Sequence, residues 1–259
     1  MDKNKERTMK RLFLIVLILT ISFISYSFAE TIVISKAVKG NLPLDPMDSR
    51  WNTAEGIAVP MAPQNIVKPG ITESTVPSIK IGSLHNGKDI AFRIEWYDPT
   101  RNDTVNMPDR FSDASALQFP VNADEEPTFM MGQKGSPVHI IQWRASWEKD
   151  ITMGYMPGLS VGNLLSNPIV TLSVEELNAE GFGTLTSQER QNSKGKGFWD
   201  YAHWKVVILK PLNSGDKSDT VLTSGKTVPL AIAIWDGEKN DRGGRKNFSE
   251  GGWIMLKIE

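Results

Sequence analysis

The sequence predicts an all-β fold, an antiparallel β-sandwich with long loops and little helix. The main evidence is the segment 78–97, where apolar and polar residues alternate on both sides of a central Asn86-Gly87 pair. Two alternating runs that flank Asn-Gly are a strong hairpin signal. Strand and helix patterns do not alternate along the chain, which disfavours a parallel sheet. We therefore expect one β-sandwich domain over residues 30–259.

Most of the remaining sequence has the composition of short strands separated by Pro, Gly, Asn and Asp clusters, as in sandwiches. One helix is expected at 173–180, because Ser173 and Glu176 match a capping box. The other expected strands are 31–38, 54–61, 114–119, 138–143, 204–209, 228–235 and 253–258.

Composition excludes several functional classes. The chain carries 29 Lys and Arg against 30 Asp and Glu, a formal net charge of −1, so it offers no electrostatic footprint for nucleic acid. It contains no Cys, which excludes disulfides, iron–sulfur clusters, thiolate metal sites and covalent attachment of a c-type haem. Its hydrophobic content of 40% is that of a folded chain.

Residues 1–29 have the features of a secretory signal peptide. A basic start is followed by an apolar run of about 13 residues at 12–24 and by the small-x-small sequence Ser27-Phe28-Ala29. The apolar run is shorter than the ~20 residues of a spanning helix, although an uncleaved anchor is the alternative. We expect export to the periplasm or an equivalent compartment. No later stretch is suited to span a membrane.

The sequence contains no recognisable enzyme motif. A glycine-rich phosphate loop, H-E-x-x-H and G-x-S-x-G are all missing. The three His residues are far apart, and His139, within a strand pattern, is expected to be a hydrogen-bonded structural residue. The acidic run 124–126 is expected to be a solvated loop. These features favour a binding or electron-transfer module without catalytic residues over a hydrolase.

Three segments together resemble a known family. They are WNTAEGIAVPMAPQNIVKP with IAFRIEWYDPT, then DASALQFPVN with PTFMMGQKGSPVHIIQW, and finally FWDYAHWKVVILKPL with VPLAIAIWDGEKNDRGGRKNFSEGGWIMLKI. Their order resembles the haem-b-binding γ subunit of the ethylbenzene-dehydrogenase type. Such subunits accompany exported molybdopterin enzymes of the dimethyl-sulfoxide-reductase superfamily, which includes ethylbenzene, dimethyl sulfide, selenate, chlorate and nitrate/nitrite enzymes.

The resemblance implies a β-sandwich that holds one non-covalent haem b between a Met and a Lys. The family Met precedes a Gly and a strand ending in Trp, which matches Met131, with Met130 as second choice. The family Lys lies between a W-D-G motif and the last Trp strand, which matches Lys246, with Lys239 as second choice. A Lys binds iron only as the free amine, so its proton must be displaced. With both axial positions filled, such a haem transfers electrons and binds no substrate.

The walls of the haem site are expected to include aromatic residues near these ligands. The candidates are Trp143, Trp235, Phe129 and Trp204, with Arg144 or Arg245 near the propionates.

The implied partners are an iron–sulfur β subunit, a molybdopterin α subunit and a soluble cytochrome. The segment PMAPQNIVKP favours a nitrite- or nitrate-type complex. Two alternatives remain open at this stage. One is a non-catalytic carbohydrate-binding sandwich whose exposed Trp side chains stack on sugars, and the other is a stand-alone secreted haem shuttle.

Overall fold

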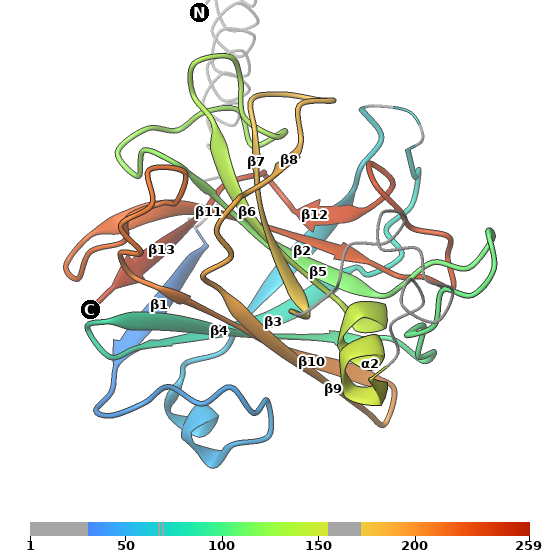
Figure 1. Cartoon of the computed structure of the whole chain (residues 1–259), viewed down its shortest axis with the longest axis horizontal. Coiled ribbons are helices and arrows are strands. Elements are labelled where there is room, and N and C mark those ends of the chain that lie inside the picture. The colour runs from blue at the N-terminus through green and yellow to red at the C-terminus, as the bar shows by residue number, and fades with distance from the viewer. Residues whose placement is uncertain (1–30, 67, 69, 155–171) are drawn as a thin grey trace, which may run out of the picture. The chain divides into compact units, whose positions relative to one another are not determined.

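The structure of the chain is a computed structural model that describes residues 31–66, 68, 70–154 and 172–259. The expected signal peptide lies outside these residues. Within them the fold is almost entirely β-structure with one short α-helix, which confirms the predicted all-β class (Figure 1). None of the described helices has the length and apolar character needed to cross a membrane.

Thirteen strands, one 3₁₀ helix and one α-helix make up the described chain. In order they are β1 (Ile32–Ala37), η1 (Ser49–Thr53), β2 (Ile57–Pro63), β3 (Ser78–His85), β4 (Asp89–Tyr97), β5 (Ala114–Pro120), β6 (Val138–Arg144), α2 (Ala145–Met153), β7 (Val174–Ala179), β8 (Thr186–Ser187), β9 (Lys194–Asp200), β10 (His203–Pro211), β11 (Thr227–Trp235), β12 (Asn247–Ser249) and β13 (Ile254–Ile258).

Two sheets are joined at their corners by strands that belong to both. One sheet has the order β9-β10-β4-β3-β2, and the other β8-β7-β6-β5-β11-β12-β2. The first half of β2 pairs with β3 and the second half with β12. Likewise, β11 pairs with β13 at its start and with β5 at its end. Strands that change sheet in this way form the corners of packed sandwiches. Among the described strands, β1 alone pairs in parallel, with β3 and β13.

The sheet containing β5, β6 and β7 buries apolar side chains on both faces. Because side chains alternate along a strand, Ile141 points into the interior between the sheets while its neighbour Ile140 points outward. The outward-facing cluster consists of Ala114, Ala116, Val138, Ile140, Leu177, Ala179 and Trp235. This outer apolar face forms the floor of the candidate site.

The predicted β3–β4 hairpin is confirmed, with Gly87 in the turn at φ 82°. The acidic run 124–126 is exposed, as expected. The predicted helix at 173–180 is wrong, since this segment forms β7 and pairs with β6 along its length. The two presumed capping residues act elsewhere: Ser173 donates to the carbonyl of Gly195, and Glu176 is fully buried. The α-helix of the described chain, α2, was not predicted.

Trp143 fills the space between the two sheets at the end near α2. Its ring centroid lies 5.1 Å from that of Trp204, and its indole N–H donates to Glu148 of α2 at 2.6 Å. The facing strand β9 has a glycine here, and a Cβ atom at Gly197 would come within 2.3 Å of the Trp143 ring. The absence of a side chain at Gly197 therefore makes room for the indole.

We expect Gly197→Ala to lower the free energy of unfolding by about 1–3 kcal/mol, the usual cost of overpacking a core. Urea denaturation would measure it. Gly56→Ala is the matched control, because an added Cβ there meets only the flexible side chain of Lys80. Equal stability of the two variants would contradict this account of the Trp143 contact.

Candidate functional site

A cavity of about 460 Å³ lies over the outer face of the β5–β6–β7 sheet. Its apolar wall comes from strand and loop side chains, namely Ala114, Ile140, Leu177, Phe182, Leu185 and Trp235. A smaller hollow of about 60 Å³ is lined by some of the same side chains and adds Phe129 and Met130. The volume of the larger cavity, about 460 Å³, falls within the range of roughly 300–1,000 Å³ that is usual for small-molecule and cofactor sites.

Met131 enters the cavity from the loop between β5 and β6. Its backbone has φ 72°, an uncommon conformation for a residue other than glycine, and Gly132 follows with φ 74°. The Met131 carbonyl accepts a hydrogen bond from Gly181 N at 2.7 Å. A side chain at Gly132 would press on the carbonyls of Ala179 and Ser136 at 2.9 and 3.0 Å. The backbone at position 132 therefore requires a glycine, and this glycine lets the loop hold Met131 at the cavity.

Lys246 reaches the same cavity from the loop between β11 and β12. Its Nζ atom lies 3.9 Å from Sδ of Met131 and 5.2 Å from the centre of the Trp235 ring. In the described part of the chain, no carboxylate lies within ion-pair distance of Nζ. Burial lowers the pKa of Lys246 to about 8. This lysine therefore loses its proton more readily than an exposed one.

The loop that carries Lys246 is tied down on both sides. The Trp235 indole donates to the carbonyl of Gly243 at 3.0 Å. The Gln64 side chain donates to the carbonyl of Gly244 at 2.7 Å, and its backbone N–H donates to the carbonyl of Lys246. These bonds fix the direction from which the amine enters the cavity.

The structure brings together some of the residues predicted for the site and separates others. Trp235 lines the cavity, and Phe129 lines the adjoining hollow and stacks on Phe248 at 5.4 Å. Met130 lines only the smaller hollow.

Three other candidates lie away from the cavity. Trp143 points from β6 to the inner side of its sheet, Trp204 packs against it from β10 of the other sheet, and Lys239 is exposed. The two-residue period of β6 could have placed Trp143, because Ile140, Gln142 and Arg144 all face outward.

Two arginines line the cavity. Arg144 lies 3.1 Å from a Glu175 oxygen and stacks over Trp147, and Arg242 stacks over Phe111. Arg245, the other candidate, is not part of the lining.

Sequence reasoning missed the role of Arg242, as well as Phe182 and Leu185. All three lie in loops, where side-chain direction has no period. By contrast, the alternation of side chains in β6 could have predicted that Ile140 faces outward, toward the cavity.

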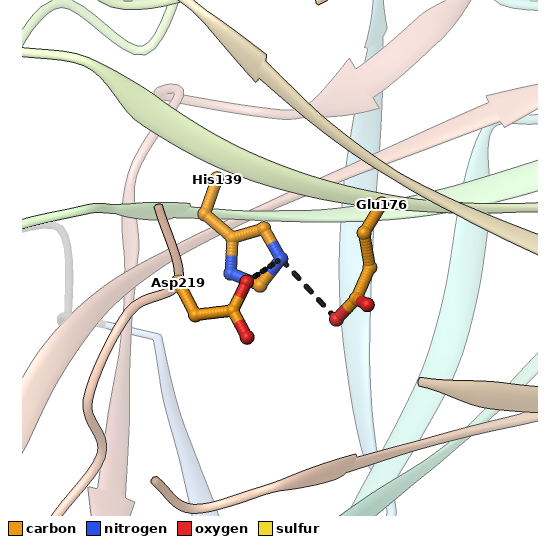
Figure 2. A group of neighbouring side chains, drawn as sticks. All are labelled: His139, Glu176 and Asp219. Atoms are coloured by element: carbon orange, nitrogen blue, oxygen red, sulfur yellow. Dashed lines mark ion pairs between the residues drawn. The ribbon is translucent and has the colours of Figure 1, made fainter. Parts of the chain in front are cut away.

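His139, Glu176 and Asp219 form a second buried group, on the inner side of β6 and β7 (Figure 2). Nε2 of His139 lies 3.5 Å from Glu176 and 3.4 Å from Asp219. The backbone N–H of Thr220 donates to Nδ1 at 3.2 Å, so the ring carries its proton on Nε2, facing the carboxylates. A protonated Nε2 offers no lone pair to a metal. This agrees with the structural role expected for His139.

Comparisons with known proteins show that the chain is similar to subunits of oxidoreductases. The family model described as ethylbenzene dehydrogenase matches residues 48–158 and 147–247. A Haloferax mediterranei protein named as a respiratory nitrate reductase heme subunit is 28% identical over 222 residues, 86% of this chain and 71% of that one. The dimethylsulfide dehydrogenase subunit gamma of Rhodovulum sulfidophilum is 28% identical over 245 residues, covering 88% and 82%.

Two further matches either cover less of the chain or share less of its sequence. The chlorate reductase subunit gamma of Ideonella dechloratans is 28% identical over 163 residues, 63% of this chain and 58% of that one. Among solved structures, a family 9 carbohydrate binding module from Caldicellulosiruptor kristjanssonii, in complex with glucose, aligns with a TM-score of 0.47 at 9% identity. The alignment covers 88% of this chain and 95% of the module.

Replacing Lys246 with Met should stabilise the ligand-free chain at pH 7 by up to about 3 kcal/mol, because the ammonium no longer has to be buried. The unfolded lysine keeps its proton up to a pKa of about 10.5, whereas the folded one loses it near 8. The stability cost of Lys246 is therefore full below pH 8 and disappears as the pH rises to 10.5.

Urea denaturation of both proteins from pH 7 to 10.5 measures this difference. Lys239→Met is the control, since Lys239 is exposed, and it should change little. A stability difference between Lys246→Met and the unaltered chain that does not vary with pH would contradict the prediction.

Proposed function

This chain belongs to the ethylbenzene dehydrogenase family, and from that membership we propose that it is a non-catalytic electron-transfer subunit that binds one haem b non-covalently. The observation that carries the proposal is the pairing of Met131 and Lys246 at one apolar cavity, with their donor atoms 3.9 Å apart. The relatives named as a heme subunit and as gamma subunits support the same assignment.

The donor set fits a haem iron held on both sides. Met131 and Lys246 would hold the iron through a thioether sulfur and an amine nitrogen, which are ligands suited to a transition metal. The haem, when bound, supplies a one-electron couple. A Met ligand raises its potential. Lys246 has no carboxylate partner among the described residues, and its lowered pKa makes it easier for an iron to displace its proton. These two side chains leave no position open for a substrate.

The remaining lining suits both the apolar ring of a porphyrin and its charged propionates. Ile140, Leu177 and Trp235 provide an apolar wall for the ring. Arg144 and Arg242 are the guanidinium groups in the lining, and guanidinium pairs well with carboxylates such as the haem propionates. We assign these two arginines to the propionates and Arg245 to the support of its own loop, where its Nη1 donates to the carbonyl of Gly70.

In this proposal, substrate chemistry takes place on a molybdopterin α subunit. An iron–sulfur β subunit connects that centre with this chain, which exchanges single electrons with a soluble cytochrome. The features of residues 1–29 support an exported, periplasmic or equivalent location. The relative named for nitrate reductase supports a nitrite- or nitrate-type complex.

We expect the chain, exported by a host that supplies haem, to show a low-spin b-type spectrum that sharpens on reduction with dithionite. A pyridine haemochrome assay should identify non-covalent protohaem. Met131→Ala or Lys246→Ala would remove one of the two proposed iron ligands, so each should convert the low-spin spectrum to a high-spin one.

The controls are substitutions of the two second-choice iron ligands. Met130→Ala and Lys239→Ala should leave the spectrum unchanged. A spectrum disturbed only in the two controls would show that the ligands were assigned to the wrong residues. A folded protein that stays colourless after hemin is added would refute haem binding and leave the carbohydrate-binding alternative.

A further inference from the structure

Three buried aspartates meet where strands of both sheets end. Asp98 follows β4 directly, Asp113 precedes β5, and Asp236 follows β11. One carboxylate oxygen of each lies within 4.8 Å of the others. Their exposed fractions are 0%, 0% and 4%. The fold therefore gathers three acidic groups from distant parts of the sequence at one buried point.

No positive side chain in the described ranges forms an ion pair with any of the three. Burial raises the pKa of Asp113 to about 8 and that of Asp236 to about 6, and the charge of Asp98 adds to both shifts. Three unpaired carboxylates in such a place are costly unless a cation or protons neutralise them.

The hydrogen bonds around the group favour the ionised form. Asp113 accepts from Asn102 N at 2.7 Å, Gly237 N at 2.9 Å and the Trp204 indole at 2.9 Å. Three N–H donors stabilise a carboxylate more than a neutral acid. These bonds oppose the effect of burial but do not overcome it, because the pKa of Asp113 remains raised to about 8.

One oxygen of the group has no partner. Oδ1 of Asp98 accepts from the backbone N–H and the hydroxyl of Thr100, at 3.0 and 2.9 Å. Oδ2 of Asp98 is buried and makes no hydrogen bond. A fully buried carboxylate oxygen without a hydrogen bond, beside two more carboxylates, requires a cation or a proton to neutralise it.

We propose that Asp98, Asp113 and Asp236 bind one Ca²⁺ ion. The donors are all hard oxygens, which Ca²⁺ prefers. At Ca–O distances of about 2.3–2.6 Å, ligands on opposite sides of one ion lie up to roughly 5 Å apart, which matches the spread of the three oxygens. Asn102 adjoins the group, because its backbone N–H donates to Asp113 at 2.7 Å.

The other buried acidic group of the described chain makes a useful contrast. Nε2 of His139 faces both Glu176 and Asp219, at 3.5 and 3.4 Å, and the charge of the buried Lys210 acts on both carboxylates. Within the described residues the three aspartates have no buried lysine of this kind, although the charge of the exposed Lys239 acts on Asp236.

The calcium site would also brace the cavity. Ser112 and Ala114 flank Asp113, and both line the cavity, as does Trp235 beside Asp236. An ion at this point would clamp β4 of one sheet to β5 and β11 of the other. It would also fix the start of the loop that leads to Lys246.

The test uses the full-length purified chain, stripped with EDTA and titrated with CaCl₂. Elemental analysis after re-addition should find one Ca²⁺ per chain. The unfolding midpoint should rise by roughly 5–10 °C at a hundredfold excess over Kd. Tb³⁺ in place of Ca²⁺ should luminesce on excitation of the nearby Trp204. These measurements do not depend on haem, so they can fail or succeed independently of the proposed function.

Two near-isosteric variants and one control decide the location. Asp98→Asn and Asp236→Asn should each abolish the Ca²⁺ response. Asp103→Asn, in the same loop but paired with Arg101 and Lys149, should keep it. If Asp98→Asn does not fold, Asp236→Asn and the titration of the unaltered chain still decide the outcome.

Two results would overturn the proposal. One is an unfolding midpoint that does not respond to about 10 mM CaCl₂, tenfold above the Kd of the weakest extracellular sites. The other is a Ca²⁺ response that persists in both variants, which would place the ion elsewhere.

Discussion

The sheet formed by β5, β6 and β7 is covered by apolar side chains on both faces, and the arrangement of the molecule depends on this double burial. An ordinary sandwich sheet hides one face and exposes the other to water. Here Ile141 and Trp143 complete the core, while Ile140 on the same strand faces a cavity. Leaving such a wall in water costs free energy, so a large apolar ligand that covers it would bind with a hydrophobic gain.

Met131 and Lys246, which reach into this cavity, are positioned by the backbone conformation and the backbone hydrogen bonds of their loops. Met131 has a left-handed backbone, and Gly132 is confined by three neighbouring backbone atoms. Strain of this kind persists only where the surroundings over-determine it, and it is concentrated at functional sites. The Lys246 loop is fixed by hydrogen bonds from Gln64 and Trp235. Both donor atoms are thus positioned before any ligand arrives, which reduces the entropy cost of binding.

Local patterns were enough to predict the fold class, the Asn86-Gly87 hairpin and most strands. They failed at 173–180, where Ser173 and Glu176 fit a helix cap but pairing with β6 decides the outcome. For the site, resemblance indicated Met131 and Lys246, which lie 115 positions apart, and periodicity alone could not have paired them. Phe182 and Arg242 come from loops without a period. The aspartate group is also invisible in sequence, because only the strand order brings its three members together.

The loop between β11 and β12 carries an unpaired acid at its start and an unpaired amine at its end. It begins at Asp236, one of three buried carboxylates with no ion-pair partner in the described chain, and ends at Lys246, a buried amine that likewise has none. Direct pairing of Lys246 with Asp236 would have neutralised both, yet the fold holds them apart, with Lys246 against Met131 and Trp235. The unpaired amine beside a thioether and the clustered acids without an ion-pair partner are the two donor sets on which the haem and calcium proposals rest. A soft thioether with an amine suits a transition metal, and clustered carboxylates suit a hard cation.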